Sequence, residues 1–336
     1  MRISWLAIAF VGTMASAVSA QAPKITPTCD RACLEGYVDR YLDAMLANEV
    51  NPKLFARDVK FTENGVRLPL GNEGLWFGMS GKGKYKFYVP DVETQQVAFI
   101  GTVIENTRGR GANNGEGDKV AIALRLKIVG GVITEVEQLA VRPDTPLGGR
   151  GGARAGGAAP PAAPAGRGAG PGASGTGDRV DAMGQPHPVF REVIPEAKRA
   201  SREDLIETAN YYFTGLARND GKGYYPFTAD CERFENGVSM THTNCKAQFE
   251  NTLRGIVSRI RDRRFVAVDR ERGIVFAFAF FDHDNINWTW QLGELFKIEN
   301  GQIRRVEAVF HRAPYGIPSG WSTFEQAMSE SIQSIR

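Results

Sequence analysis

The most constraining feature of this 336-residue sequence is that it repeats itself. Residues 54–66, which contain Glu63-Asn64-Gly65-Val66, return 172 positions later as residues 226–238, which contain Glu235-Asn236-Gly237-Val238. Further matches link residues 87–97 to 265–275, and residues 127–142 to 297–312. Self-similarity of this kind indicates a duplicated structural unit. We therefore expect two domains of about 120 residues each.

The two copies are separated by residues 148–177, which hold 12 Gly, 9 Ala and 4 Pro and no large apolar side chain. Such a segment cannot bury enough surface to offset the entropy lost on ordering, so we expect a flexible linker. The predicted organisation is listed here in chain order: a signal peptide at 1–20, the first repeat at 29–145, a disordered linker at 146–180, and the second repeat at 181–336 with a C-terminal helix.

The N-terminus has the pattern of a secretory signal peptide. Arg2 is followed by an apolar run from Trp5 to Met14 and by Val18-Ser19-Ala20, a small-x-small cleavage site before Gln21. An apolar run this short does not reach across a bilayer, although an uncleaved anchor is the alternative. The sequence therefore predicts a periplasmic or secreted protein with no membrane attachment after cleavage.

Export would place the four cysteines in an oxidising compartment, where they can form disulfides. Cys231 and Cys245 lie fourteen residues apart across the turn-like Glu235-Asn236-Gly237, and we expect them to pair. Cys29 and Cys33 then pair with each other or stay free. A zinc site is the alternative, but a CxxxC spacing without a nearby His or CxxC is a weak metal signal.

Both repeats read as helices followed by strands. The expected elements of the second repeat, and the first helix of the chain, are listed here: helices Leu34–Ala47, Arg202–Arg218 and Gln248–Ile260, strands Ile274–Phe281, Trp288–Ile298 and Ile303–His311, and a terminal helix. Ser201 with Asp204, and Ser322 with Glu325, resemble helix caps. Asn300-Gly301 predicts a tight hairpin turn. Helices that precede long antiparallel strands indicate an α+β fold.

This order of elements resembles the cone fold of nuclear transport factor 2 and the SnoaL-like enzymes. The residues that carry the resemblance are 259–265 (RIRDRRF), 280–283 (FFDH) and the repeated Glu-Asn-Gly, and it covers 29–142 and 199–312. In tandem form it looks like a family of unknown function. The resemblance implies two cone-shaped domains, each with N-terminal helices packed on a curved antiparallel sheet around a funnel-shaped pocket. The superfamily includes isomerases, dehydratases, cyclases, lyases, epoxide hydrolases and plain binding modules, so the fold does not settle the function.

The strand Trp288–Ile298 carries the best catalytic candidate. With a period of two, Glu294 shares a face with five large apolar residues, and the first repeat has Leu124 at its position. A carboxyl group in apolar surroundings has a raised pKa, as a general acid or base working near neutral pH requires. The alternative is a buried glutamate paired with an arginine of the segment 259–264.

Other candidates surround this strand. His283 is the proposed catalytic partner of Glu294, and a strand-end histidine bonded to a loop is the alternative. Glu235 is either a turn residue or a third catalytic group. The remaining binding candidates are two apolar wall residues, one residue at the pocket mouth and one strand-end acid: Trp288, Trp290, Tyr211 and Asp282. Adjacent strand residues point to opposite faces, so Asp282 and His283 cannot both enter one pocket.

Composition and missing motifs narrow the function. With 41 basic and 38 acidic residues the net charge is +3, which excludes a generally basic nucleic-acid binder. The sequence contains no GxxxxGK[ST], HExxH or GxSxG motif, and its one GxGxxG match, residues 170–175 (GPGASG), lies in the Gly/Ala/Pro-rich segment with no strand expected before it. Neither a nucleotide cofactor nor a metal is therefore expected. We expect an exported, cofactor-free isomerase or lyase that acts on a small, partly apolar metabolite by acid–base catalysis. The alternative is a non-catalytic ligand-binding or dimerisation module, in which the repeats pair with each other or the protein homodimerises.

Overall fold

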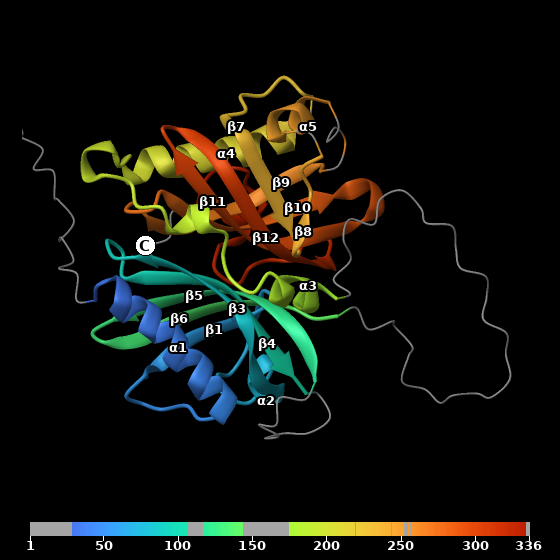
Figure 1. Ribbon diagram of the computed structural model, residues 1–336. Helices are drawn as coiled ribbons and strands as arrows, with labels where there is room; N and C mark the ends of the chain where they lie inside the picture. The colour runs from blue at the N-terminus through green and yellow to red at the C-terminus, as the bar shows by residue number, and fades with distance from the viewer. Residues whose placement is uncertain are drawn as a thin grey trace, which may run out of the picture.

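The computed structural model describes residues 29–106, 117–143, 175–218, 220–242, 244–251, 255 and 257–333. The predicted signal peptide and most of the predicted linker lie outside these residues. Figure 1 shows two halves, each with a long helix against a curved sheet. Within the described ranges, no helix combines the length and the apolar composition needed to span a bilayer.

The two halves use the same elements in the same order. The first half comprises α1 (Arg31–Ala47), β1 (Phe55–Glu63), β2 (Val66–Arg67), α2 (Leu75–Gly78), β3 (Met79–Asp91), β4 (Gln96–Glu105), β5 (Asp118–Val129) and β6 (Val132–Val141). The second half comprises α4 (Arg202–Arg218), β7 (Phe227–Glu235), β8 (Val238–Ser239), α5 (Cys245–Asn251), β9 (Arg259–Asp269), β10 (Ile274–His283), β11 (Trp288–Glu299) and β12 (Gln302–Pro314).

Each half forms one six-stranded sheet, in the orders β2-β1-β6-β5-β4-β3 and β8-β7-β12-β11-β10-β9. These equivalent orders confirm the tandem repeat. The long strands β3–β6 and β9–β12 pair antiparallel, but β1 runs parallel to β6 and β7 runs parallel to β12. The expectation of a purely antiparallel sheet is therefore wrong at this one strand pair in each half.

The two long helices begin and end where local chemistry dictates. The Asp30 side chain accepts a hydrogen bond from the Cys33 amide at 2.9 Å at the start of α1, and Asn48 ends this helix in the left-handed region. The Ser201 hydroxyl accepts from the Asp204 amide at 3.0 Å at the start of α4. Both predicted helices are confirmed, and each buries its apolar stripe against its sheet.

Two predicted helices are wrong in extent. The helix expected to reach Ile260 ends at Asn251, because Gly255 lies in the left-handed region (φ 72°) and Arg259 already begins β9. The terminal helix α6 spans only Phe324–Met328, and its capping box is made by Thr323 and Gln326. Ser322, expected to be the cap, instead donates its hydroxyl to Asp262 at 2.5 Å.

The repeated Glu-Asn-Gly is explained by turn geometry. Asn64-Gly65, Asn236-Gly237 and Asn300-Gly301 all have positive φ at both positions, as two-residue hairpins prefer. The Asn236 side chain also accepts from the Phe310 amide at 2.9 Å and donates to its carbonyl at 3.0 Å. This turn therefore fastens the β7–β8 hairpin to β12 as well as reversing the chain.

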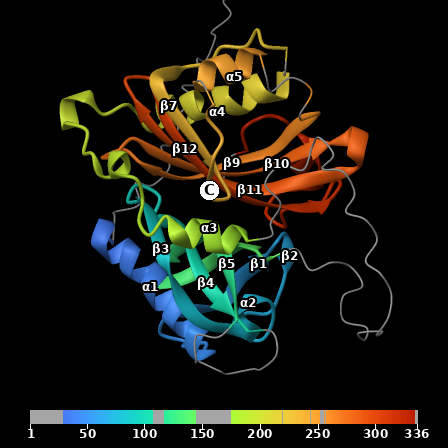
Figure 2. The same cartoon turned by 45° about the vertical axis from the view of Figure 1, so that its right-hand side comes forward.

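The predicted end of the linker, at residue 180, is wrong, because residues 176–182 form α3 (Thr176–Ala182). Asp181 of α3 accepts hydrogen bonds from the Lys84 amide at 2.5 Å and the Thr102 hydroxyl at 2.6 Å, and it pairs with Lys119 at 2.7 Å. Composition alone did not reveal these contacts. Figure 2 shows α3 beside the junction of the two halves.

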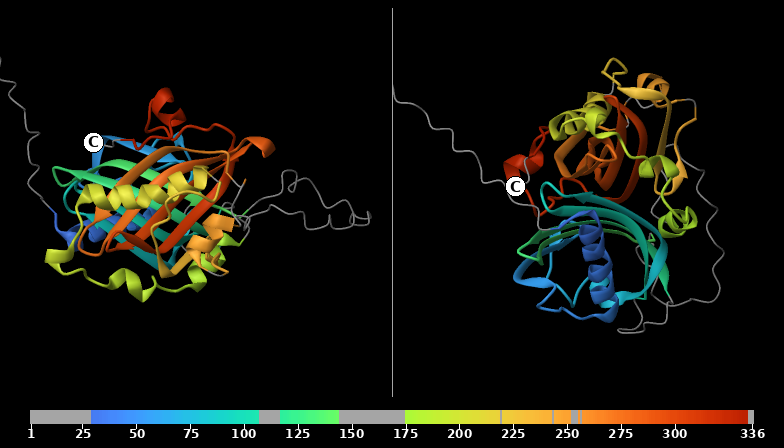
Figure 3. Two further views of the ribbon diagram at one scale, coloured as in Figure 1. Left: turned by 90° about the horizontal axis from the view of Figure 1, so that it is seen from above. Right: turned by 60° about the vertical axis from the view of Figure 1, so that its left-hand side comes forward.

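The two sheets pack against each other through the faces that their own helices do not cover (Figure 3). One apolar cluster combines side chains of both sheets, including Phe87 and Ile100 from the first and Phe276 and Phe278 from the second. The backbones come so close that a Cβ at Gly293 of β11 would lie 2.6 Å from that of Ala123 in β5. The junction is therefore as tightly packed as a domain core.

Charged groups are buried in the same junction. Arg264 donates to Glu137 of the other half at 2.7 Å, and both side chains are almost fully buried. The Tyr85 hydroxyl donates to Glu307 at 2.6 Å, again between halves. Such pairs hold the halves in one register, because separating them would leave charges without partners.

Replacement of Glu137 by Ala is expected to destabilise the protein by about 3 kcal/mol, since the buried Arg264 guanidinium loses its partner across the junction and keeps Asp262 at 3.1 Å on its own strand. The change is measured by urea denaturation at neutral pH. Glu93→Ala is the matched control, because Glu93 pairs with Arg270 across the same junction at 2.9 Å but both groups are exposed. Its expected cost is below about 1 kcal/mol. Equal costs for the two variants would contradict a structural role for the buried pair.

Candidate functional site

The disulfides place the short elements of the second half. Cys231 of β7 is bonded to Cys245, the first residue of α5, and Cys29 is bonded to Cys33. The predicted Cys231–Cys245 bridge is confirmed, and Cys29 and Cys33 pair with each other instead of staying free. The first bridge holds α5 beside β7, so that Gln248 of α5 reaches Arg233 of β7.

Glu294 lies on the inner face of the second sheet, the face covered by α4. The register places it opposite Ala308 of β12 on one side and Ala277 of β10 on the other, and Ala308 in turn lies opposite Glu235 of β7. The row across four strands therefore reads Glu235, Ala308, Glu294, Ala277. Glu294 is only 2% exposed, as the alternating pattern predicted.

The first half fills the equivalent row differently. There the register reads Glu63, Gln138, Leu124, Phe99 across β1, β6, β5 and β4. The second half thus has two alanines where the first has a glutamine and a phenylalanine, and an acid where the first has Leu124.

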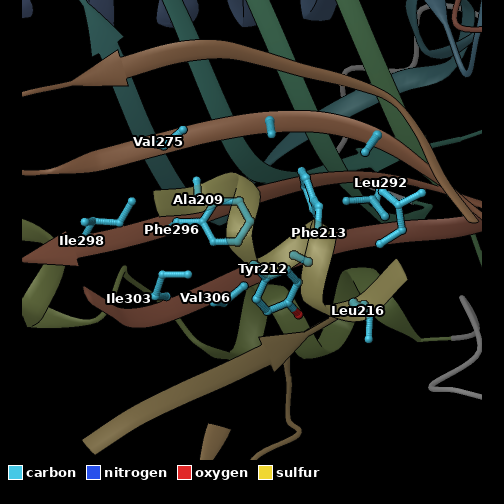
Figure 4. Close-up of a cluster of buried hydrophobic side chains, with 14 of the residues drawn as sticks. Ala209, Tyr212, Phe213, Leu216, Val275, Leu292, Phe296, Ile298, Ile303 and Val306 are labelled. Carbon is cyan, nitrogen blue, oxygen red and sulfur yellow. The ribbon is translucent and has the colours of Figure 1, made fainter. Parts of the chain in front are cut away.

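Arg233 is the cation of this site. It donates to the Tyr212 hydroxyl at 3.1 Å and to the Gln248 side chain at 3.3 Å, and it forms an ion pair with Glu235. Figure 4 shows Tyr212 projecting from α4 into the cluster of rings above the sheet, beside Phe296. The buried arginine therefore joins a helix, a strand and α5 at one point.

Burial raises the pKa of Glu294 to about 8, and the negative charge of Glu235 adds to this effect. The charge of Arg233 and a hydrogen bond with Tyr212 act in the opposite direction without cancelling it. One carboxyl oxygen, Oε2, has no hydrogen-bond partner. Glu294 is thus a carboxyl group that is largely protonated at neutral pH and has one free oxygen.

The expected arginine partners of Glu294 are engaged elsewhere. In the segment 259–264, Arg259 and Arg261 bind Asp282, and Arg264 binds Glu137. The cation whose charge acts on Glu294 is Arg233, which the sequence reasoning missed. The signal was present, because Arg233 occupies the position of Phe61 at the 172-residue offset, and a charge that replaces a buried aromatic residue is unusual.

His283 lies on the same face as Glu294 but far from it. It pairs with Trp288 in the register, whereas Glu294 pairs with Ala277, so six residues of β10 separate the two positions, about 20 Å at the usual strand rise. The expected acid–base pair of Glu294 and His283 is therefore not formed. His283 packs against Trp290, with ring centroids 4.3 Å apart and the ring planes tilted by 58°, so these two residues define the other end of the face.

Two further binding candidates lie outside the inner face. Asp282 is fully buried and accepts hydrogen bonds from Arg259, Arg261 and Thr289; burial alone would raise its pKa, but these bonds lower it below its usual value. It is a structural ion-pair residue with no oxygen free for a ligand. Tyr211 donates to Glu207 at 3.0 Å on the outer side of α4, beside an open groove, away from Glu294.

No group of three or more His, Cys, Asp or Glu side chains in the described ranges has metal-site geometry. The residues that the structure does bring together are Glu235 and Glu294 from the sequence-based candidates, and Tyr212, Arg233 and Gln248 in addition. Together they place a buried carboxyl group, Glu294, next to a hydrogen-bonded cation, Arg233. A carboxyl group in this setting can give a proton to a bound molecule or take one from it.

Glu294 makes the stability of the protein depend on pH. Its folded-state pKa of about 8 exceeds the unfolded value of 4.5, so the folded state binds an extra proton between these values and its free energy of unfolding falls as pH rises through this range. Glu294→Gln removes this dependence. Relative to the variant, the wild type is expected to lose about 3–5 kcal/mol between about pH 5 and pH 9 in urea denaturation. Parallel curves for the two proteins would contradict the raised pKa.

The neighbours of Glu294 tune the same titration in opposite directions. Arg233→Met removes a charge that lowers the pKa of Glu294, so the loss of stability should move to higher pH by about one unit or more. Glu235→Gln removes a charge that raises it, so the loss should move to lower pH. Each shift is measured against the same variant with Glu294→Gln added. Shifts of the same sign would show that Arg233 and Glu235 do not act on Glu294 by charge.

Comparison with known proteins gives a partial match. Residues 198–310, from the start of α4 into β12, match a family described as a domain of unknown function (DUF8021). No curated protein matches the chain. A solved structure described as "Crystal structure of a de novo designed protein with curved beta-sheet" is similar at 15% identity and a TM-score of 0.26, over 33% of this chain and 88% of that chain. A likeness of this size carries no functional argument.

Proposed function

We propose that the protein is an exported, cofactor-free enzyme of the isomerase or lyase type, and that Glu294 transfers the proton. The observation that carries the proposal is a carboxyl group with a pKa of about 8 and one unpartnered oxygen on the inner face of the second sheet. Buried carboxyl groups with such pKa values are concentrated in active sites, because a general acid or base works best when its pKa lies near the working pH.

The chemistry follows from what surrounds the acid. As a carboxylate, Glu294 would take a proton from a carbon next to a carbonyl group, and as an acid it would return the proton to another carbon or to a leaving hydroxyl, which departs as water. The first outcome is an isomerisation and the second is an elimination. The apolar walls of Leu292 and Phe296 favour a small, partly apolar substrate.

The proposed fold family and compartment are supported by the second sheet and by the disulfides. The curved sheet wrapped round α4 supports the SnoaL-like cone fold that the sequence resembles, and in that fold the active site lies between sheet and helix. Two disulfides support an oxidising compartment, since such bonds persist mainly outside the cytosol.

A second candidate function is ligand binding or pairing without reaction. The interior between α4 and the sheet is occupied by rings in contact, with centroids of Tyr212 and Phe249 4.9 Å apart and those of Phe213 and Phe296 5.6 Å apart. The two sheets also cover each other, as a built-in dimer would. Turnover that depends on Glu294 separates the two candidates.

The test uses a panel of compounds in place of an identified substrate. The protein is incubated in heavy water with small enolisable ketones and β-hydroxy acids, and mass spectrometry measures deuterium incorporation and loss of water. We expect the Glu294→Gln protein to be slower by about 100-fold or more, since a positioned general base contributes at least that much. The wild-type exchange rate should rise with pH to a plateau above about pH 8.

The control is Glu307→Gln in the same half. Glu307 is also buried, but it bonds Tyr85 and Arg305 in the junction between the sheets. This variant should keep the wild-type exchange rate. Exchange that survives in the folded Glu294→Gln protein, or an absence of exchange across the panel, would leave the binding function as the better account.

A further inference from the structure

A second group of polar residues lies at the other end of the inner face of the second sheet. His283 ends β10 and Trp288 begins β11, and the two lie opposite each other in the register across the short turn η3 (Asp284–Ile286). Arg312 lies on the adjacent strand β12, opposite Trp290. Because Glu294 is six residues away along β11, about 20 Å, this group is separate from the site that contains Glu294.

Two buried polar side chains in this group lack hydrogen-bond partners. His283 is 3% exposed, and neither of its ring nitrogens makes a hydrogen bond of good geometry. The indole Nε1 of Trp288 is also buried without an acceptor. Buried polar groups are almost always satisfied, so orphans that lie side by side need an explanation. Both residues can donate a hydrogen bond, and the indole can only donate.

The third member, Arg312, lacks an anion. Its guanidinium lies over the Trp288 ring at 3.7 Å from the centroid, and it has no acidic partner among the residues that the structure describes. The ring holds the charge in place without neutralising it. Arg312, which is exposed, and His283, which is buried, thus both lie against Trp288 at one strand end, and none of the three has an acidic partner among the described residues.

In the first half, the chain itself supplies an acidic partner for the equivalent arginine. There Arg142, the counterpart of Arg312, makes two hydrogen bonds to the Glu105 carboxylate, at 2.7 and 2.9 Å, and a third to Glu63 at 2.7 Å. At the offset that matches Val97 to Val275, the counterpart of Glu105 is His283. The second half has therefore exchanged a carboxylate for a donor and kept the arginine.

We propose that His283, Trp288 and Arg312 form a binding site for a carboxylate from outside the chain. The ligand carboxylate takes the place that Glu105 occupies in the first half, accepting from the guanidinium, from the indole N–H and from one imidazole N–H. The half-exposed rings of Trp288 and Trp290 favour an acid with an aromatic or short aliphatic body. The site does not depend on Glu294 acting as a catalyst.

Binding is tested on the full chain by tryptophan fluorescence, with acetate, benzoate and octanoate as probes up to about 10 mM. We expect saturable binding of benzoate or octanoate, and at least about tenfold weaker binding of the neutral benzamide, because the ion pair is lost. Arg312→Met should weaken binding about tenfold or more for the same reason. His283→Glu should abolish binding of the acids, because the chain then supplies its own carboxylate to Arg312, as in the first half.

Arg304→Met is the matched control, since Arg304 lies on the same strand and pairs with Glu192 and Glu299 near its other end. It should bind like the wild type. Thermal denaturation checks that each variant is folded, and His283→Gln replaces His283→Glu if the latter is not. No saturable binding of any of the three acids overturns the proposal, and so does equal binding of benzamide, or binding unchanged in both Arg312→Met and the His283 variant. Catalysis by Glu294 is measured separately, by deuterium exchange.

Discussion

The whole molecule depends on sheets whose two faces are both buried. Every residue of β10 is buried, as are nearly all residues of β4, its counterpart. A strand of this kind needs a cover on each side, and one helix covers only one. The other half supplies the second cover, and its contact includes charged groups that cannot be separated cheaply, such as Arg264 with Glu137. Neither half is therefore complete without the other, although each has its own helix and its own sheet.

Because packing between the halves stabilises both of them, the helix-covered face of each sheet can carry different side chains. The first half fills its central row with Gln138, Leu124 and Phe99, whereas the second has Ala308, Glu294 and Ala277. A buried acid among alanines is a local loss, because desolvation disfavours its charge and small side chains pack less well. Departures from local packing rules of this kind are concentrated at functional sites, where other parts of the structure compensate for them. The second half carries the departures and the first carries the conventional core.

Sequence reasoning identified the residues whose burial follows from a regular pattern, either alternation along a strand or the internal repeat. Glu294 alternates with apolar residues along a long strand, so its burial could be predicted, and the repeat predicted that both halves share one order of elements. Arg233 was missed because no strand was predicted over β7, so no face of a sheet could be assigned to it. The predicted pairing of His283 with Glu294 was wrong. Alternation along the sequence shows that two residues share a face of a sheet, but it does not show how far apart they lie on that face. The helix α3 was missed because Asp181 is held by Lys84 and Thr102, which lie 97 and 79 positions away in the sequence.

The comparison of the halves also explains why one duplicated fold can carry two sites on a single face. In the first half Glu63 and Glu105 share Arg142, so one arginine satisfies both acids. In the second half Glu235 has its own arginine, Arg233, and the exchange of an acid for His283 leaves Arg312 without one. The single charge cluster of the first half thus corresponds to two poles in the second, a proton-binding pole at Glu294 and the proposed anion-binding pole at Arg312. The anion-binding pole uses positions that are polar and paired in the first half, Arg142 and Glu105, whereas the proton-binding pole uses positions that are apolar there, Leu124 and Phe61. The strand order is the same in both halves, so these differences in side chains leave the topology of the sheet unchanged.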